Sequence, residues 1–252
     1  MINEKKIIRV SLVVQLIDEF TDQLVSGQGI ELSIDGESKP VRKSEGYYVF
    51  TNLKATQAVL RFSSPIYQGE MVELDLLPEQ FCMVKLRIRP NRNYSFPSGT
   101  TILEGEAEKG SLVMYYQKEG KECLKLLFDA ETKGKNPLEK LSIYNPENKN
   151  LDGRIFVISN EEEKKEELIQ IREQSIQKEQ EYLLMEPLRN SYKKLGTKIF
   201  PVSTSKTDEQ GRFLLPIRYA QRISPNGIFE IRGKKKVKKS VSLVEGQCNW
   251  MK

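Results

Sequence analysis

The chain of 252 residues contains no histidine. Histidine is the commonest general base and the commonest nitrogen ligand for zinc, copper or iron, so its absence removes the Ser-His-Asp and Cys-His catalytic devices and the usual metal centres. Paired carboxylates or a lysine are all that remains for acid–base chemistry. We therefore expect a protein that is not an enzyme, with no catalytic residue, no cofactor and no metal site.

Cysteines and long apolar runs are also scarce. The three cysteines are far apart and lack C-x-x-C spacing: Cys82, Cys123 and Cys248. Isolated cysteines in odd number indicate reduced thiols, which predicts a cytoplasmic protein. No stretch approaches the roughly 18–20 uncharged apolar residues that cross a bilayer, so we expect no membrane span.

The first 20 residues are the only segment that resembles a targeting sequence. Their apolar run contains Arg9 and Gln15, alternates strictly, and has no small-residue cleavage site before Asp18. These features argue against a signal peptide. The sequence predicts a protein that stays in the cytoplasm, or is released within a particle assembled there.

Charge is distributed unevenly along the chain. The net charge is +5, but residues 189–252 hold 15 Lys or Arg against 4 Asp or Glu, so the preceding part is mildly acidic. Such a division is typical of a protein that binds nucleic acid or an acidic partner, and equally of one whose parts dock on each other or on other copies.

Short alternating segments dominate both ends of the chain. Apolar residues alternate with polar ones over 8–16, 30–34, 47–53, 58–63 and 70–77, with a turn signal every 8–15 residues. This spacing predicts an antiparallel β-sandwich over 1–80. We expect residues 81–99 to form a linker or a shared strand. We expect residues 100–252 to form a second sandwich, because strand patterns occur both before and after a charged segment within this range.

That charged segment, residues 159–184, has a different texture. It lacks Gly and Pro, is rich in Glu, Lys and Gln, and begins with Ser159 followed by Glu162, as a helical capping box does. A narrow apolar stripe includes Ile169, Ile176 and Leu183. We expect a charged helical insertion at about 160–195, bent at a proline, which is either solvated and held only at its ends or packed on the basic C-terminal sheet or on a neighbouring subunit.

Two phrases on either side of the insertion are similar to each other. "KSEGYYVFTNL" (43–53) and "KTDEQGRFLLPI" (206–217) each place an acid and a glycine before an aromatic strand. A glycine suits a left-handed turn position, and the aromatic seals the end of a sandwich. The second phrase resembles the T-D-x-x-G-x-F-x-[FL] motif of the transthyretin-like or carboxypeptidase-regulatory-like β-sandwich family, and "LVVQLIDEFTDQLVSGQGIELSIDG" resembles that family's opening strand and turn.

The resemblance implies a mainly β protein of two tandem antiparallel immunoglobulin-like or transthyretin-like sandwiches. Members of the family are generally non-catalytic accessory modules, cell-surface stalks or structural parts of large particles. The first unit is also similar to small accessory proteins of phage-tail-like contractile particles. These likenesses imply a structural or adaptor protein whose partners are other proteins or copies of itself.

Two sets of residues are the candidates for binding a partner. Tyr47 and Tyr48 are neighbours on a strand, so we expect one to lie in the core and the other to face outward. The run "RGKKKVKKS" (232–240) supplies five lysines: Lys234, Lys235, Lys236, Lys238 and Lys239. It could bind nucleic acid, but few aromatics lie nearby, and lysines that protect an edge strand explain it better, so nucleic acid is not the expected partner.

Other clusters have simpler interpretations. Asp18, Glu19 and Asp22 could form a cation site, and Asp208 with Glu209 begins like a calcium loop, but turn-forming carboxylates account for both. A carbohydrate- or surface-binding module is the alternative function. It would need an exposed aromatic cluster, for which the candidates are Tyr47, Tyr48, Tyr115 and Tyr116.

Overall fold

The structure is a computed structural model that describes residues 8–27, 29–35, 38–76, 82–118, 123–132, 137–175, 178–218 and 227–251. These residues form β-strands joined by turns, with one short 3₁₀ turn, η1, at Ser44–Gly46. The prediction of a mainly β protein with two sandwiches is confirmed. The chain divides into two compact units, Met1–Ser95 and Phe96–Lys252.

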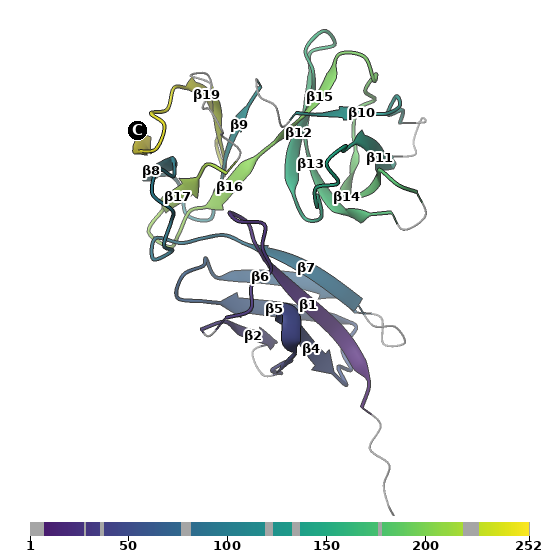
Figure 1. Ribbon diagram of the computed structural model, residues 1–252, viewed down its shortest axis with the longest axis vertical. Helices are drawn as coiled ribbons and strands as arrows, with labels where there is room; N and C mark the ends of the chain where they lie inside the picture. The colour runs from purple at the N-terminus through teal and green to yellow at the C-terminus, as the bar shows by residue number, and fades with distance from the viewer. Residues whose placement is uncertain are drawn as a thin grey trace, which may run out of the picture. The chain divides into compact units, whose positions relative to one another are not determined.

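The first unit is a sandwich of two sheets (Figure 1). One sheet has the order β3-β4-β1-β7 and the other β2-β5-β6. Strand β7 belongs to this unit, where it runs parallel to β1. The strands are β1 (Val10–Asp18), β2 (Glu31–Ile34), β3 (Val41–Arg42), β4 (Tyr47–Thr51), β5 (Gln57–Ser63), β6 (Glu70–Asp75) and β7 (Cys82–Ile88).

The core of this sandwich follows from the alternation of its strands. On β5, Ala58, Leu60 and Phe62 are buried while the residues between them are half-buried or exposed. Leu12, Val14 and Leu16 of β1 and Tyr48 and Phe50 of β4 meet them from the opposite sheet. Successive side chains on a strand point to opposite faces, so each strand contributes every second residue to the core.

The second unit contains a sandwich of similar topology. Its sheets have the orders β17-β8-β20 and β16-β9-β18-β19. The strands are β8 (Ile102–Glu106), β9 (Leu112–Gln117), β16 (Ser203–Lys206), β17 (Arg212–Pro216), β18 (Gly227–Arg232), β19 (Lys236–Val241) and β20 (Cys248–Met251). The last strand, β20, pairs in parallel with the first, β8, just as β7 pairs with β1.

Six of the seven strands of the two sandwiches correspond; the exception is β16, which pairs with β9, whereas its counterpart in chain order, β3, pairs with β4. The three-strand pattern β4-β1-β7 matches β17-β8-β20, and β2-β5-β6 matches β9-β18-β19. The similar sequence phrases precede β4 and β17, the equivalent strands. Gly46 (φ +74°) and Gly211 (φ +78°) both occupy the left-handed region just before them. The repeated phrase therefore marks the same turn in both units.

Between β9 and β16 the second unit contains a closed six-stranded barrel (Figure 1), with neighbours in the order β10-β11-β14-β13-β12-β15. Its strands are β10 (Leu124–Leu126), β11 (Leu138–Tyr144), β12 (Ile155–Asn160), β13 (Lys165–Gln174), β14 (Glu181–Leu188) and β15 (Thr197–Pro201). The barrel has a core of its own, which includes Ile158, Ile171 and Tyr182. A further cluster joins it to the sandwich through Tyr116 and Phe200.

The predicted helical insertion at 160–195 is wrong, because the described residues of this range form the end of β12, strands β13 and β14, and connecting turns. On β13, Ile169 and Ile171 are buried between exposed neighbours, and on β14 Tyr182 and Leu184 are buried. Both pairs are spaced two apart, which is a strand period. Ser159, expected as a helix cap, lies inside β12. Ile176, assigned to the apolar stripe, lies outside the described residues.

Pro187 does not bend a helix but lies in β14. The register of β14 against β11 shifts between the pairs Leu183–Lys140 and Leu188–Leu138. Pro187 falls in this irregular stretch and is exposed. A proline cannot donate to a regular ladder, so an irregular register is where a strand accommodates it.

Candidate interaction surfaces

Tyr47 and Tyr48 face opposite sides of β4, as alternation predicts. Tyr48 is 4% exposed and belongs to the core, whereas Tyr47 is partly exposed on the outer face of its sheet. Burial raises the pKa of the Tyr48 hydroxyl, and the charge of Arg42 reduces that effect. Of the two candidates, only Tyr47 is therefore placed to contact a partner.

Tyr47 lies beside a row of apolar side chains that crosses the whole sheet. Val41 of β3 pairs with Val49 of β4, Val49 pairs with Val13 of β1, and Val13 pairs with Met83 of β7. We call Val13, Val41, Val49 and Met83 the outer row. Val41 is 53% and Met83 45% exposed. Apolar side chains on four adjacent strands form a continuous surface. Exposing this surface to water is unfavourable in free energy, so burying it against a partner would be favourable.

The lysine run 234–239 lies in and before β19, the edge strand of its sheet in the described part of the chain. Lys234 contacts Glu108 at 2.9 Å, and Lys236 contacts the buried Glu230 at 3.2 Å. Lys238 pairs with Glu166 of the barrel strand β13. Carboxylates of the same unit therefore hold three of the five lysines.

The remaining two lysines differ. Lys239 lies over the ring of Phe229, with its ammonium 5.7 Å from the ring centroid, and Lys235 is exposed. Phe229 is itself buried in the core. Proteins that bind single-stranded nucleic acid combine cations with exposed aromatic rings on which bases stack, and the described residues of β19 include no aromatic ring.

Charge complementarity joins the acidic part of the barrel to the basic sheet. Lys118 contacts Glu161 at 3.1 Å, and Glu166 lies between Lys238 and the Tyr116 hydroxyl, which it approaches at 3.2 Å. Burial lowers the pKa of Lys238, but its bonds to Glu166 and Tyr116 raise it overall. Burial raises the pKa of Tyr116 to about 12. The acidic residues of the barrel therefore contact the basic residues of the sheet through strands and not through a helix.

The tyrosines that would form a carbohydrate platform are mostly in the core. Tyr115 is 2% and Tyr116 1% exposed, and Tyr48 is buried as well. Sugar-binding rings must be open to solvent on one face. Tyr47 alone remains of the four, so these residues do not form an exposed aromatic cluster.

Asp18 anchors a turn and does not form an open cation site. Its Oδ1 accepts the backbone N–H groups of Phe20 at 2.7 Å and Thr21 at 3.1 Å, and its Oδ2 accepts the hydroxyls of Tyr67 at 2.9 Å and Tyr94 at 2.6 Å. Burial, together with the Asp18 charge, raises the pKa of both tyrosines. Four donors satisfy this buried carboxylate, which is a structural role.

The carboxylates next to Asp18 are also engaged. Arg87, buried on β7, contacts Glu19 at 3.4 Å and Asp22 at 2.8 Å. Asp22 has a φ of +63°, the left-handed conformation that Asp tolerates in turns. The three acids that could have bound a cation therefore fasten the turn after β1 to β7 and to the loops that contain Tyr67 and Tyr94.

Asp208 has a similar role before β17. Its Oδ1 accepts the backbone N–H groups of Gln210 at 2.9 Å and Arg212 at 2.8 Å. Burial raises the pKa of this carboxyl, but these hydrogen bonds and the Arg212 guanidinium bring it below its usual value. The calcium-loop alternative gains no support, since no group of three or more acidic or cysteine side chains placed to hold a metal occurs in the described residues.

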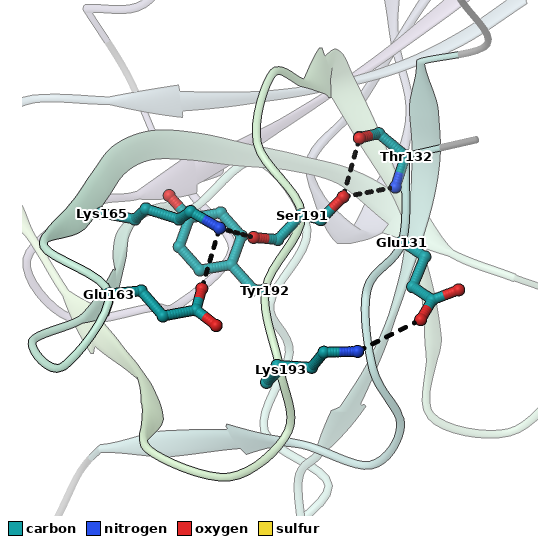
Figure 2. A pocket seen from close by; sticks show the side chains of 7 residues that line it. All are labelled: Glu131, Thr132, Glu163, Lys165, Ser191, Tyr192 and Lys193. Atoms are coloured by element: carbon teal, nitrogen blue, oxygen red, sulfur yellow. Dashed lines mark hydrogen bonds and ion pairs between the residues drawn. The ribbon is translucent and has the colours of Figure 1, made fainter. Parts of the chain in front are cut away.

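One end of the barrel holds a pocket of about 420 Å³ (Figure 2). The lining residues are polar and come from three loops and the start of β13: Glu131, Thr132, Glu163, Lys165, Ser191, Tyr192 and Lys193. Sequence reasoning missed this pocket because it placed these loops in or beside a helix. In the sequence, these loops are distinguished only by their many polar residues.

The polar groups of the pocket bind one another. Figure 2 shows the Lys165 ammonium between Glu163, at 2.9 Å, and the Ser191 carbonyl, at 3.1 Å. The Ser191 hydroxyl instead bonds to the hydroxyl of Thr132 at 2.8 Å. Lys193 bridges Asp129 and Glu131, and these contacts raise its pKa. A serine nucleophile would need the lysine at its hydroxyl, so the arrangement is not a Ser–Lys catalytic pair.

Among the described residues, no helical segment has the length and apolar character needed to span a bilayer.

Comparison with known proteins yields no family. No family model matches the chain, and no curated protein matches its sequence. Several solved structures share distant similarity, including the following three. The Bacillus anthracis TIE protein is 12% identical with a TM-score of 0.27, over 97% of this chain and 51% of that one. The Bacillus cereus major pilin subunit BcpA is 8% identical with a TM-score of 0.26, over 95% and 69%.

The third is the shaft pilin SpaA of Lactobacillus rhamnosus GG, 12% identical with a TM-score of 0.20, over 97% and 96% of the two chains. The chain spans about half the length of the TIE structure. At these TM-scores the likenesses are too distant to assign the chain to a family, and the description of its surfaces rests on its own residues.

Proposed function

We propose that this protein is a non-catalytic structural or adaptor protein that acts through protein–protein contacts. The observation that carries the proposal is the outer row with the adjacent Tyr47 on sheet β3-β4-β1-β7. Tyrosine and methionine are enriched in protein interfaces, and a contiguous apolar surface is a typical docking site. A partner that covers the row would remove Val41 and Met83 from water.

The polar clusters support the same conclusion. Asp18 and Asp208 hold turns, and Lys165 and Ser191 are engaged in separate hydrogen bonds. Each of these residue sets, which could have carried chemistry, has a structural role. A protein without histidine whose reactive side chains are committed to its own fold is better suited to binding than to catalysis.

The finer parts of the proposal come from the sequence resemblance. We propose that the two sandwiches are immunoglobulin-like modules of the transthyretin-like kind, in a cytoplasmic protein that serves a larger assembly such as a phage-tail-like contractile particle. The neighbouring genes test this part. Tail-tube, sheath or baseplate genes beside this one are the expected result, and neighbours that encode only isolated enzymes would contradict it.

The docking role is tested by affinity purification from the source cells followed by quantitative mass spectrometry. Wild-type bait is compared with a Val41→Lys/Met83→Lys variant, in which two exposed side chains of the outer row become charged. The matched control is Leu195→Lys, an apolar residue 86% exposed on the barrel. We expect a partner that wild type and control both retain and that the outer-row variant loses by tenfold or more.

Two results would overturn the proposal. One is a set of captured proteins that does not change in the outer-row variant. The other is salt-sensitive retention of the protein on immobilised DNA or RNA, which would favour nucleic-acid binding through residues 232–240.

A further inference from the structure

Strands β6 and β19 occupy equivalent edge positions in the two sandwiches. Each ends its sheet in the part of the chain that the structure describes, after β5 in one unit and after β18 in the other. An edge strand has a row of backbone N–H and C=O groups directed away from its own sheet, ready to pair with another strand. Because the two edges have the same position in their sheets, their backbones alone would allow them to pair with the same strands.

The two edges carry opposite charge. On β6, Glu73 and Asp75 are exposed on the outer face, with Met71 67% exposed beside them. On β19 the outer face presents Lys236 and Lys238, whose side chains are 59% and 35% exposed. Like charges directly opposite each other on paired strands are destabilising. Two β6 edges, or two β19 edges, therefore repel each other.

One antiparallel register matches every charged position on the outer face. With Asp75 opposite Lys236, Glu73 lies opposite Lys238. On the inner face of the same register, Leu74 lies opposite Val237, a residue 45% exposed. The outer face of one sheet then continues into the outer face of the other, and the inner face into the inner.

From this match we propose that copies of the chain associate head to tail, with β6 of one copy pairing antiparallel with β19 of the next. The inference deepens the proposed function, on which it rests, by naming one partner as a second copy of this chain. Because each copy has one edge of each kind, the contact is heterologous and can extend into a ring or an open chain.

The carboxylates of the same unit do not use up the charge of β19. Of the ion pairs along this edge, Glu108 contacts Lys234 and Glu166 contacts Lys238, whereas the single carboxylate of Glu230 serves both Arg232 and Lys236. A net positive charge remains along the edge. An acidic strand such as β6 supplies two carboxylates together with backbone groups that can hydrogen-bond to β19. It can therefore pair with both the lysines and the outward-directed backbone groups of this edge, which isolated anions cannot do.

Sedimentation velocity of the purified full chain, over a range of concentrations in low and high salt, tests the proposal. Wild type is expected to self-associate at low salt and to dissociate as salt screens the cross-strand pairs. The variant Glu73→Lys/Asp75→Lys changes two exposed residues of β6 and should weaken association by about tenfold or more. It keeps its own β19, so added to wild type it should shorten the assemblies by capping them.

Variants of β19 and of distant surfaces complete the test. Lys236→Gln/Lys238→Gln should also lose association, whereas Lys236→Arg/Lys238→Arg should keep it. Controls reverse charge elsewhere, in Glu147→Lys/Glu186→Lys and Lys54→Glu/Lys194→Glu, and should behave as wild type. Circular dichroism establishes that each variant is folded.

Three outcomes overturn the head-to-tail contact: a monomer under all conditions, association that the β6 variant leaves unchanged, or loss in the β19 variant alone, which would show a different occupant. None of them bears on the outer row, which contains no β6 or β19 residue. Failure here is therefore distinguishable from failure of the proposed function.

Discussion

The outer faces of two equivalent sheets, β2-β5-β6 and β16-β9-β18-β19, differ in what covers them. In the first unit this face presents Glu31, Arg61 and Glu73 to solvent. In the second unit the same face presents Met114 and Tyr116, both buried against the barrel. Strands β2-β5-β6 and β9-β18-β19 correspond, so the side chains on one face are what distinguish the sandwich without an insertion from the one that carries an inserted barrel.

Removing the barrel should have the largest effect on this comparison. Replacing residues 118–200 by Asn-Gly would join β9 to β16 as a hairpin, because Tyr115 and Ser203 already pair antiparallel and the same register places Pro201 opposite Gln117. We expect the shortened protein to aggregate, since Met114 and Tyr116 become exposed. Size-exclusion chromatography measures the outcome.

The matched control for this deletion makes the exposed face resemble that of the first unit. In the shortened protein, Met114→Ser with Tyr116→Thr should restore a soluble monomer. A shortened protein that is soluble without these changes would show that the barrel is not needed to cover the sheet.

Single substitutions on the two faces should differ by several kcal/mol. Tyr116 is 1% exposed and stacks on Phe200 of the barrel with ring centroids 6.5 Å apart. Tyr116→Ala should lower the free energy of unfolding by about 3–5 kcal/mol. Ser33→Ala, on the corresponding face of the first unit, should change it by less than about 0.5 kcal/mol. Denaturant unfolding measures both, and equal effects would refute the contrast.

The two glycine turns should differ by a smaller amount. An added Cβ at Gly211 would lie 2.5 Å from the Ala107 carbonyl oxygen, and at Gly46 it would lie 3.0 Å from that of Val25. Both residues have positive φ, which disfavours alanine. Gly211→Ala should cost about 2–3 kcal/mol and Gly46→Ala about 1–2 kcal/mol. Thermal unfolding tests the order, which the opposite ranking would contradict.

Glu230 should show the smallest effect, and one that depends on pH. Its carboxylate is buried on the sheet that the barrel covers; burial raises its pKa, but contacts with Arg232 and Lys236 bring it below the usual 4.5. A lowered folded-state pKa contributes stability that is present above about pH 4.5 and is lost as pH falls further. Glu230→Gln should cost about 1–2 kcal/mol at neutral pH.

Urea unfolding at several pH values measures this difference between wild type and Glu230→Gln. We expect the difference to shrink as pH falls below about 4.5. A difference that is constant with pH would show that the ion pairs contribute nothing. Arg61→Gln on the exposed face of the first unit is the control, and it should have no such acid dependence.

Much of the first unit could be predicted because each of its strands is half-buried. Alternation alone places Leu60 in the core and divides Tyr47 from Tyr48. The barrel could not be predicted in the same way. Glu, Lys and Gln favour helices in isolation, and in residues 160–188 this local preference outweighed the two-residue spacing of Ile169 and Ile171 in our interpretation. Pairing with neighbouring strands overrides such preferences.

The candidate surface was also only partly visible in the sequence. Tyr47 could be named from its own strand, but Val13, Val41, Val49 and Met83 lie far apart in the chain. They form one row through the registers of three strand pairs. Register depends on how distant strands meet, so no local pattern reveals it.

The sequence by itself determined that this protein is built mainly from strands, that one turn occurs twice, and that an acidic segment precedes a basic one. Only the tertiary structure decided that the acidic segment is a barrel and that it covers one sandwich and not the other. The physical reason is that a side chain's spacing along a strand is local, whereas the surface that buries it is supplied by residues far away in the chain.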